Sequence, residues 1–418
     1  MHPQENKLLK TPELLAPAGN MEKLRAAIHY GADAVYLGGK RFSLRANAGN
    51  FDDEQLREAV AYAHAHGARV FVTVNIFAHL RDLDGLEEYL LFLADSGADG
   101  LIISDPGVLA IARQTVPAMR IHLSTQANVT NPAAARFWQE QGVSRLNLAR
   151  EMSLGEIKAI RAAVACKLEL FVHGALCISY SGRCMLSLYF TGRDANKGDC
   201  AHPCRYKYAL VEEKRPGQYF PVEEDDHGTY IFNAKDLCLL NRLPDLIAAG
   251  ADSLKIEGRM KSVYYVGATV RLYRAALDYL AARNYQGALS GEFAEELEKI
   301  GTRGHSENFL DGPPEQEEML YQGVTVRQDF APVGIVRKEG AEPLIEARNP
   351  IRVGQKIEYM GPGLANSLHA VRGISDQDGA PIAQANPNQL VRLTLETTTP
   401  GQIFTRNSLF RRIPESAA

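Results

Sequence analysis

The sequence predicts an α/β protein built on a closed (β/α)8 barrel of the TIM type, with a cysteine-rich insertion and a small C-terminal β-barrel domain. Two observations carry this prediction. Apolar, β-branched runs alternate with amphipathic stretches over the first two thirds of the chain, and this alternation stops near residue 326, where short strand-like runs with tight turns begin. We therefore expect the large barrel over residues 1–325, its insertion over 175–230 and the small domain over 326–418.

Eight segments are expected to form the strands of the large barrel. Their continuous hydrophobicity is typical of parallel strands, which are covered on both faces. Helical stretches such as 52–67 and 83–97 lie between them and close at glycine. The expected strands are 31–38, 68–75, 97–105, 121–126, 143–151, 167–174, 230–237 and 250–259. An open doubly wound sheet is the alternative, although no glycine-rich dinucleotide motif follows the first strand.

Length and composition narrow the class of protein. The 418 residues suffice for a large barrel and a further small domain. The sequence has no run of about 18 apolar residues and no secretory signal at its N-terminus, so we expect a cytoplasmic protein outside the membrane. The net charge of −4 gives no overall attraction for nucleic acid, so any RNA contact must come from local basic patches.

Polar residues end the expected strands. In a barrel, such residues line the face that carries the active site. They are Asn75, Ser104, Asp105, Gln126, Arg150, Glu151, His173, Glu257 and Arg259. Some of them could instead be strand-end caps and turn formers without a chemical role.

Cysteine usage points to metal rather than to disulfides. Six cysteines in a reducing compartment argue against a disulfide framework. Five of them, which could supply a thiolate set for an iron–sulfur cluster, are Cys177, Cys184, Cys200, Cys204 and Cys238. Zinc ligands usually pair at spacings of about two to four residues, which only Cys200 and Cys204 satisfy. Spacing leaves both metals open, with buried core thiols, our interpretation of Cys166, as a third possibility.

A catalytic thiol is a separate possibility. His173 lies four residues before Cys177, and a histidine–cysteine pair can generate a nucleophile. No cysteine-protease signature, metalloprotease helix motif or serine nucleophile elbow accompanies the pair. The residues themselves therefore give hydrolysis no support.

The chain resembles peptidase family U32, once described as collagenase-like. The matching segments are 13–20, 31–46, 169–187, 198–208 and 252–262. The residues that look like the family signature are Glu169, Gly174, Cys177, Gly182, Cys184 and Ser187. Better understood members are similar in carrying a four-cysteine iron–sulfur cluster and resemble oxygen-inserting enzymes, which modify ribosomal RNA cytidine, a ubiquinone precursor or the tRNA wobble uridine. Segment 215–237 and the β-rich C-terminal region look most like the branch for prephenate-dependent 5-hydroxylation of that uridine.

The resemblance implies a set of ligands and partners. It implies a cluster, expected to be 4Fe–4S, on Cys177, Cys184, Cys200 and Cys238, with Cys204 competing for the fourth place. It further implies tRNA as partner and prephenate as co-substrate, whereas the oligomeric state stays open. The residues that we expect to be catalytic are His173, Glu169, Arg150 and Glu257.

The two carboxylates of prephenate would need a cationic pocket. We expect Arg41, Arg45, Lys255 and Arg259 to bind substrate, with Gln126 as a further contact. Arg150 and Lys261 are further cationic candidates. Two of the arginines follow the first expected strand, and Lys255 and Arg259 end the last, so closure of the barrel would bring the four together.

Basic and aromatic side chains are mixed around residues 183–207. They are Arg183, Arg193, Lys197, Arg205, Lys207, Tyr189, Phe190, Tyr206 and Tyr208. Such a mixture can neutralise phosphates and stack on an extruded base, but it is also common in loops that pack over a cluster. Three functions remain: an RNA hydroxylase, a U32-type peptidase, and a non-enzymatic iron–sulfur scaffold subunit.

Overall fold

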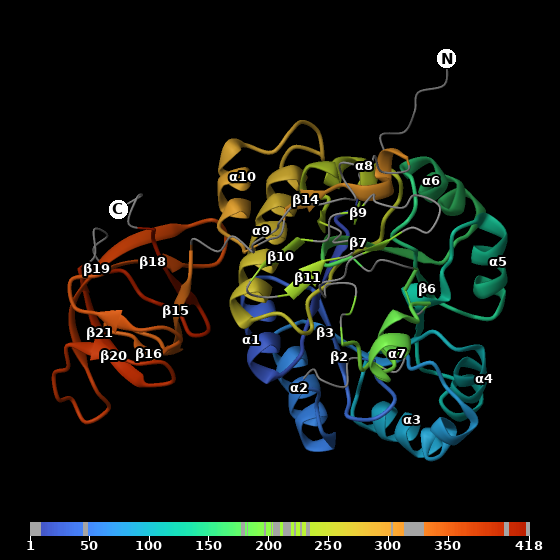
Figure 1. Ribbon diagram of the computed structural model, residues 1–418, viewed down its shortest axis with the longest axis horizontal. Coiled ribbons are helices and arrows are strands. Elements are labelled where there is room, and N and C mark those ends of the chain that lie inside the picture. Colours follow the sequence, from blue (N-terminus) through green and yellow to red (C-terminus); the bar gives the residue numbers. More distant parts are fainter. Residues whose placement is uncertain are drawn as a thin grey trace.

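Eight parallel strands close a barrel in the computed structural model (Figure 1). The structure describes residues 10–414 except 45–48, 177–179, 182, 196–197, 202, 204–209, 212–218, 221–222, 226–227, 231–234, 302–303, 313–329 and 397–400. In order around the barrel, the strands are β1 (Glu13–Pro17), β2 (Ala34–Gly38), β3 (Arg69–Val74), β4 (Gly100–Ile103), β5 (Ile121–Leu123), β6 (Arg145–Asn147), β7 (Lys167–Gly174) and β13 (Ser253–Ile256). Because β13 pairs with both β7 and β1, the barrel is closed and the predicted fold is confirmed.

The identity of one strand differs from the prediction. The barrel uses residues 13–17, whereas we expected 230–237 to supply a strand. Among the described residues of that range, β12 (Asp236–Cys238) runs antiparallel to the end of β7 and beside β14 (His305–Ser306). A five-residue run that ends at proline is too short to stand out in the sequence, although all five of its residues are buried.

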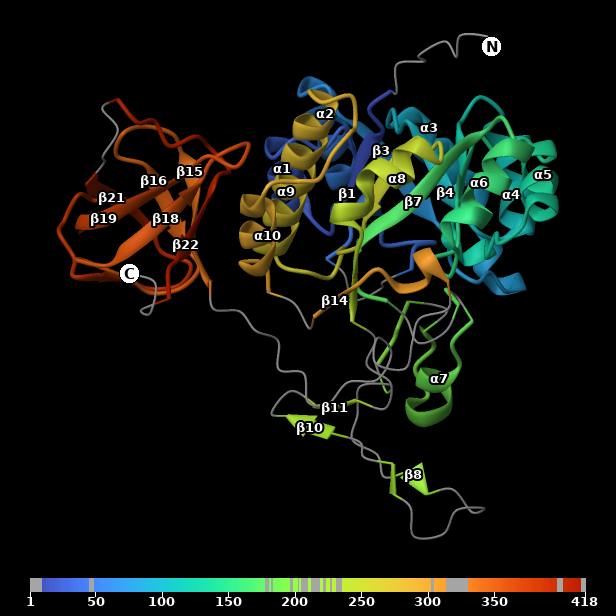
Figure 2. The same cartoon turned by 90° about the horizontal axis from the view of Figure 1, so that it is seen from above.

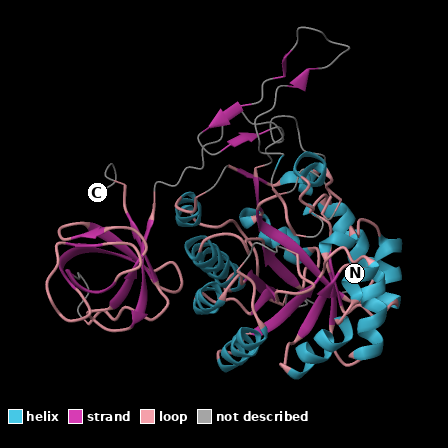
Figure 3. Ribbon diagram, turned by 60° about the horizontal axis from the view of Figure 1, so that its bottom comes forward, coloured by secondary structure: helices cyan, strands magenta, loops and turns pink. Residues whose placement is uncertain are grey.

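Helices surround the strands (Figure 3). They are α1 (Met21–His29), α2 (Asp53–Ala65), α3 (Leu86–Asp95), α4 (Pro106–Thr115), α5 (Pro132–Glu140), α6 (Leu154–Ala163), α8 (Leu243–Ala248), α9 (Val263–Ala281) and α10 (Gly291–Glu298). Side-chain oxygens of Asn20, Asp52, Asp105, Asn131, Ser153 and Ser262 accept backbone N–H groups at helix starts, which explains where these helices begin. Short 3₁₀ turns lie at Leu80–Leu83, Thr125–Ala127, Leu240–Arg242 and Asn308–Asp311.

The segment between β7 and β13 is much longer than the other connections. Besides β12 and α8 it contains the short helix α7 (Leu186–Thr191) and two small ribbons. The ribbons pair β8 (Leu210–Val211) with β9 (Tyr219–Phe220) and β10 (Glu223–Asp225) with β11 (Gly228–Tyr230). Figure 2 shows that α7 and the ribbons stand off the body of the barrel.

The C-terminal region forms a second, closed antiparallel barrel, as predicted. Its strands are, in order, β15 (Pro332–Lys338), β16 (Leu344–Ala347), β21 (Leu390–Glu396), β19 (Asn366–Ser375), β18 (Lys356–Met360) and β22 (Leu409–Arg412). A ribbon of β17 (Ile351–Arg352) and β20 (Gln384–Ala385) lies beside it. Within the described part of the chain, no helix has both the length and the hydrophobicity to cross a bilayer.

A buried ion network joins the two barrels. Glu296 of α10 accepts from Arg411 of β22 through both carboxylate oxygens, at 2.6 and 2.9 Å, and from Arg271 of α9 at 2.9 Å. Tyr30 of α1 adds a hydrogen bond to the carbonyl oxygen of Met360, at 2.7 Å. Residues of the small barrel, including Leu409, also join the apolar core of the large one. The small barrel is therefore packed onto α1, α9 and α10 rather than merely tethered.

Candidate functional site at the mouth of the large barrel

A charged network fills the interior of the large barrel. Glu169 of β7 accepts hydrogen bonds from Lys255 Nζ of β13 and Arg145 Nη1 of β6, both at 3.0 Å. Arg145 also donates to Glu13 Oε1 of β1 at 2.6 Å. All four side chains point inward because they alternate with residues that face the helices. The structure thus unites two predicted site residues, Glu169 and Lys255, with Arg145 and Glu13, which the sequence analysis did not single out.

The carboxylate of Glu169 is strongly held in its charged form. Burial alone would raise its pKa, but Lys255 and Arg145 outweigh that effect and lower the pKa to about 2. A carboxylate with so low a pKa is a weak general base near neutral pH. The geometry therefore favours Glu169 as the group that positions Lys255.

The same interior contains polar atoms that lack partners among the described residues. Both amide atoms of Asn147, at the end of β6, are buried without a hydrogen bond, and so is Nδ1 of His122 on β5. Asn147 is 1% exposed and His122 is 4% exposed. Burial, followed by the charge of Arg145, places the pKa of His122 well below its ordinary value, so the ring is neutral. Asn147 could have been found from the sequence, because in the run Arg145–Leu146–Asn147 it lies two residues after Arg145 and therefore on the same side of the strand.

Arg259 is fixed at the rim of the barrel. Its guanidinium donates to Ser43 Oγ at 3.1 Å, Thr73 Oγ1 at 3.0 Å and Asn50 Oδ1 at 2.7 Å. A Cβ at Gly38 would lie 2.2 Å from the Ser43 hydroxyl and 2.6 Å from the Arg259 guanidinium, so only glycine fits there. Arg259 therefore clamps the loop that follows β2 to the end of the last strand.

Gln126 is also held within the rim. Its Oε1 accepts from Asn75 Nδ2 at 2.6 Å and from Ser124 Oγ at 3.2 Å. Ser104 reaches the backbone carbonyl of Asn75 at 3.4 Å. Asp105, in contrast, is the N-cap of α4. It therefore has the capping role that the sequence analysis left open for residues at the strand ends.

Arg150 and Glu257, which follow β6 and β13, lie together. Arg150 Nη2 is 3.5 Å from Glu257 Oε2, and the guanidinium lies 3.9 Å from the ring centroid of Phe171. Arg150 also donates to the carbonyl oxygen of Ala175 at 2.7 Å, where the insertion begins. These contacts place a cation at the point where the insertion leaves the barrel.

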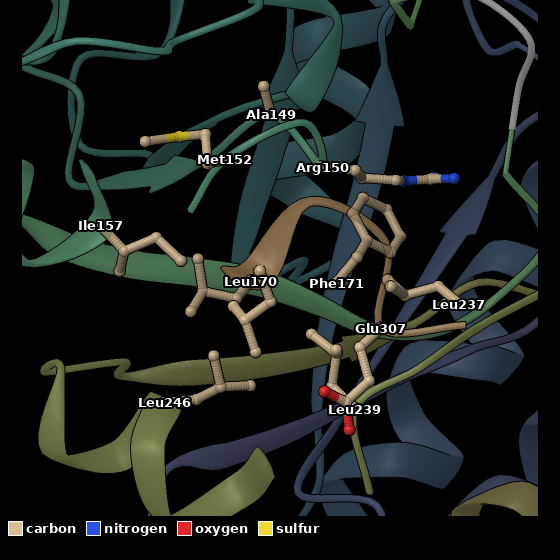
Figure 4. Close-up of a pocket in the computed structure, with 11 residues that line it drawn as sticks. Ala149, Arg150, Met152, Ile157, Leu170, Phe171, Leu237, Leu239, Leu246 and Glu307 are labelled. Carbon is tan, nitrogen blue, oxygen red and sulfur yellow. The ribbon is translucent and has the colours of Figure 1, made fainter. Parts of the chain in front are cut away.

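A small cavity lies beside Arg150. Its volume is about 20 Å³, room for about one water molecule, and it is bordered by β7, α6 and α8. Figure 4 shows the apolar side chains of Ile157, Leu170 and Leu246 turned toward this space, with the carboxylate of Glu307 at its edge. Its size and mostly apolar walls suit a packing gap rather than a substrate pocket.

His173, at the end of β7, is surrounded by other aromatic rings. The ring lies 5.5 Å from that of Tyr273, 5.9 Å from that of Tyr265 and 5.7 Å from that of His305. Burial, followed by the charge of His305, lowers the pKa of His173 to about 3. His173 is therefore a buried, neutral ring packed against α9, and its catalytic role stays a prediction.

Arg41, one of the two arginines predicted to bind substrate after β2, makes its contacts outside the barrel network. Arg41 is half exposed, pairs with Asp53 at 3.6 Å and lies 4.9 Å from the ring centroid of Tyr89. Phe42 takes a left-handed conformation, with φ of 57°, which turns the chain between Arg41 and Ser43. Arg45 lies outside the described residues. Glu151 and Lys261 are partly buried near the rim, the latter 3.9 Å from Asp236.

The described thiols fit soft-metal ligation to different degrees. Cys184 and Cys200 are partly exposed and lie on adjoining segments, because the Ala201 N–H donates to Ser187 Oγ at 2.9 Å. Cys238 is buried, its Sγ is 3.8 Å from Tyr273 Oη, and burial raises the pKa of its thiol. A thiolate donor set of this kind is compatible with an iron–sulfur cluster or zinc.

Two further predicted ligands, Cys177 and Cys204, lie outside the described residues. Within the described part of the chain, no three His, Cys, Asp or Glu side chains are grouped closely enough to hold a metal ion. The ligand set, including the choice between Cys204 and Cys238, therefore stays a prediction. Lys197, Arg205, Lys207, Tyr206 and Tyr208 of the proposed RNA segment also fall outside the described residues.

Several curated proteins are similar to this chain over most of its length. The tRNA hydroxylation protein P1 of Bacillus subtilis is 40% identical over 393 residues, 93% of each chain. The tRNA hydroxylation protein P of Escherichia coli is 38% identical and covers 84% of this chain and 86% of its own. The 23S rRNA 5-hydroxycytidine C2501 synthase of E. coli is 37% identical over 72% of this chain, which matches 45% of that longer protein.

Solved structures and family profiles give further matches. The U32 peptidase Mk0906 aligns with 62% of this chain and 97% of its own, at 16% identity and a TM-score of 0.40. Residues 19–320 match Peptidase family U32, and residues 327–409 match the Peptidase family U32 C-terminal domain. Since the two family matches cover both barrels, the chain belongs to peptidase family U32.

Proposed function

We propose that this chain is an RNA-hydroxylating enzyme whose substrate is tRNA. The observation that carries the proposal is its 40% identity to tRNA hydroxylation protein P1 over 93% of both chains. The similarity to an rRNA 5-hydroxycytidine synthase, although it covers less of that protein, supports the same chemistry on a pyrimidine in RNA. No described feature favours peptidase activity.

The finer proposal is 5-hydroxylation of the wobble uridine with prephenate as co-substrate. Hydroxylation breaks the C5–H bond of uracil and forms a C5–OH bond, which is a two-electron oxidation of the base. The co-substrate must therefore either give up an oxygen atom and be reduced by two electrons, or accept two electrons and two protons while water supplies the oxygen. A dicarboxylate needs cations that are already in place. Lys255 inside the barrel and Arg150 at its mouth supply two such cations, and each is held by a carboxylate and aromatic rings.

Each site residue then has a separate task. Lys255 and Arg150 would bind the carboxylates, and Glu169 and Glu257 would orient these two cations. The amide of Asn147 would satisfy a polar atom of the bound molecule. Gln126 and Arg259 would keep the rim in shape through Asn75 and Ser43. Cys177, Cys184, Cys200 and either Cys238 or Cys204 would hold an iron–sulfur cluster, which supplies electron transfer when bound.

The test of this proposal uses protein purified without oxygen. The chain is incubated with unmodified tRNA and prephenate, and the nucleosides are then separated and identified by mass spectrometry. We expect 5-hydroxyuridine at the wobble position, and none without prephenate. Unchanged uridine in the presence of iron-loaded protein would contradict the proposal. Cleavage of gelatin by the same preparation would support the peptidase alternative instead.

A further inference from the structure

The short helix α7 and its N-cap residue Met185 carry a concentration of exposed apolar side chains. Tyr189 is 83% exposed, Met185 58%, Phe190 48% and Leu188 38%. Single exposed apolar residues are ordinary, but a cluster of them on one short element marks an interaction surface. We call these four residues the α7 platform.

The opposite face of α7 is fastened to the protein. Ser187 is fully buried, and its hydroxyl accepts the N–H of Ala201 at 2.9 Å. Thr191 Oγ1 donates to the Ser187 carbonyl at 2.7 Å, and Gly192, with φ of 69°, ends the helix. The polar contacts therefore fix one side of the helix and leave the aromatic side turned outward.

Charge near the platform suits an anionic partner. Residues 180–193 contain two arginines and no aspartate or glutamate. Arg193 is neutralised by Asp199 at 2.6 Å, whereas Arg183 is exposed and makes no ion pair within the described part of the chain. An exposed cation beside aromatic faces is the combination that binds the phosphates and bases of unpaired RNA.

The platform is also connected to the barrel rim. Asn128 Nδ2 donates to the Ser181 carbonyl at 3.3 Å and to the Gln126 carbonyl at 2.8 Å. One side chain thus joins the segment that leads into α7 to the rim residue Gln126. A strand of RNA whose target base reaches the mouth would have neighbouring nucleotides near α7.

We propose that the α7 platform stacks unpaired bases of the tRNA that flank the target nucleotide. The rings of Tyr189 and Phe190 are 5.1 Å apart and lie at 83°, so their faces point in different directions and can take different bases. Stacking does not depend on which base is present. This inference rests on the proposed function, because it assumes that tRNA is the substrate.

The experiment measures binding of a fluorescent anticodon stem-loop RNA to the full chain. Tyr189→Ala should raise Kd about fivefold to a hundredfold, as expected for the loss of one stacked base. Tyr189→Phe should keep the wild-type Kd because the ring is retained. Phe137→Ala is the matched control, since Phe137 is 53% exposed on α5 of the barrel; its Kd should not change.

The outcomes separate this inference from the proposed function. An unchanged Kd in Tyr189→Ala, with wild-type protein that binds and hydroxylates tRNA, would overturn the platform alone. Wild-type protein that neither binds nor hydroxylates tRNA would overturn both. Two further results with Tyr189→Ala would also overturn the platform. One is that light scattering shows a dimer for the wild type and a monomer for the variant. The other is that the variant no longer binds anionic phospholipid vesicles while its affinity for RNA is unchanged.

Discussion

The joint between the two barrels and the interior of the large barrel both bury arginine–glutamate networks, but only the first is complete. At the joint, every guanidinium nitrogen of Arg271 and Arg411 donates a hydrogen bond to a protein acceptor, and both oxygens of Glu296 accept. In the large barrel, the Asn147 amide and His122 Nδ1 stay without partners among the described residues.

We propose that the difference separates a structural network from one that serves a ligand. A buried polar group without a partner costs about 1–3 kcal/mol, so a stable core has no reason to retain it. When every donor and acceptor of a network already has a partner, none is left to bond a ligand. The orphaned polar atoms therefore mark the barrel interior, and not the joint, as the place where a bound molecule would complete the hydrogen bonding.

The largest expected effect is at the joint. Glu296→Ala would leave two buried arginines without their shared carboxylate and should lower the free energy of unfolding by about 3–5 kcal/mol. Urea denaturation measures this change. Glu295→Ala, at an exposed position on the same helix, should shift the value by less than about 0.5 kcal/mol. Equal effects of the two substitutions would mean that the ion network does not hold the barrels together.

The joint should also respond to acid. Burial lowers the pKa of His29, which lies 2.8 Å from Ser408 Oγ, from 6.5 to about 4. A neutral folded histidine contributes stability above pH 6.5 that is lost as the pH falls toward 4, by up to about 3 kcal/mol. His29→Gln should therefore flatten the decline in the free energy of unfolding between pH 6.5 and 4. A decline identical to that of the wild type would contradict this assignment.

In the barrel interior, the expected effect is on catalysis. Lys255→Met removes a cation from the proposed carboxylate site and should raise KM for prephenate about tenfold to a hundredfold, the loss of one charged hydrogen bond. Steady-state kinetics with tRNA in excess measures it. Arg41→Met, on the half-exposed side chain that the structure places away from the site, should leave KM unchanged. A raised KM in Arg41→Met together with an unchanged KM in Lys255→Met would instead place the carboxylate site at the arginines after β2.

The smallest expected effect is on stability, and its sign is informative. Asn147→Leu removes an amide that has no described partner, so the free energy of unfolding should stay constant or rise by about 1 kcal/mol while hydroxylation falls. Asn75→Leu is the control, because its amide bonds to Gln126 and its loss should destabilise the protein. Clear destabilisation by Asn147→Leu would show that the amide serves the fold.

The sequence predicted the architecture better than the site. The long buried strand β7, the capped helix α2 and the amphipathic helix α3 carry strong local patterns, so they were found, whereas the short strand β1 was missed. The pairing of Glu169 with Lys255 depends on barrel closure, which was foreseen only as a general consequence of the fold. The position of Arg41 was not foreseen, because a left-handed turn at Phe42 redirects the loop.

Oxygen insertion into tRNA by the barrel interior is the central claim, and nucleoside mass spectrometry tests it most directly. Wild-type, Arg41→Met and Lys255→Met proteins, prepared without oxygen and matched in iron content, are given the same unmodified tRNA and a prephenate concentration below the wild-type KM. We predict 5-hydroxyuridine from the first two and much less from the third. Equal amounts from all three, or none from the wild type, would contradict the account.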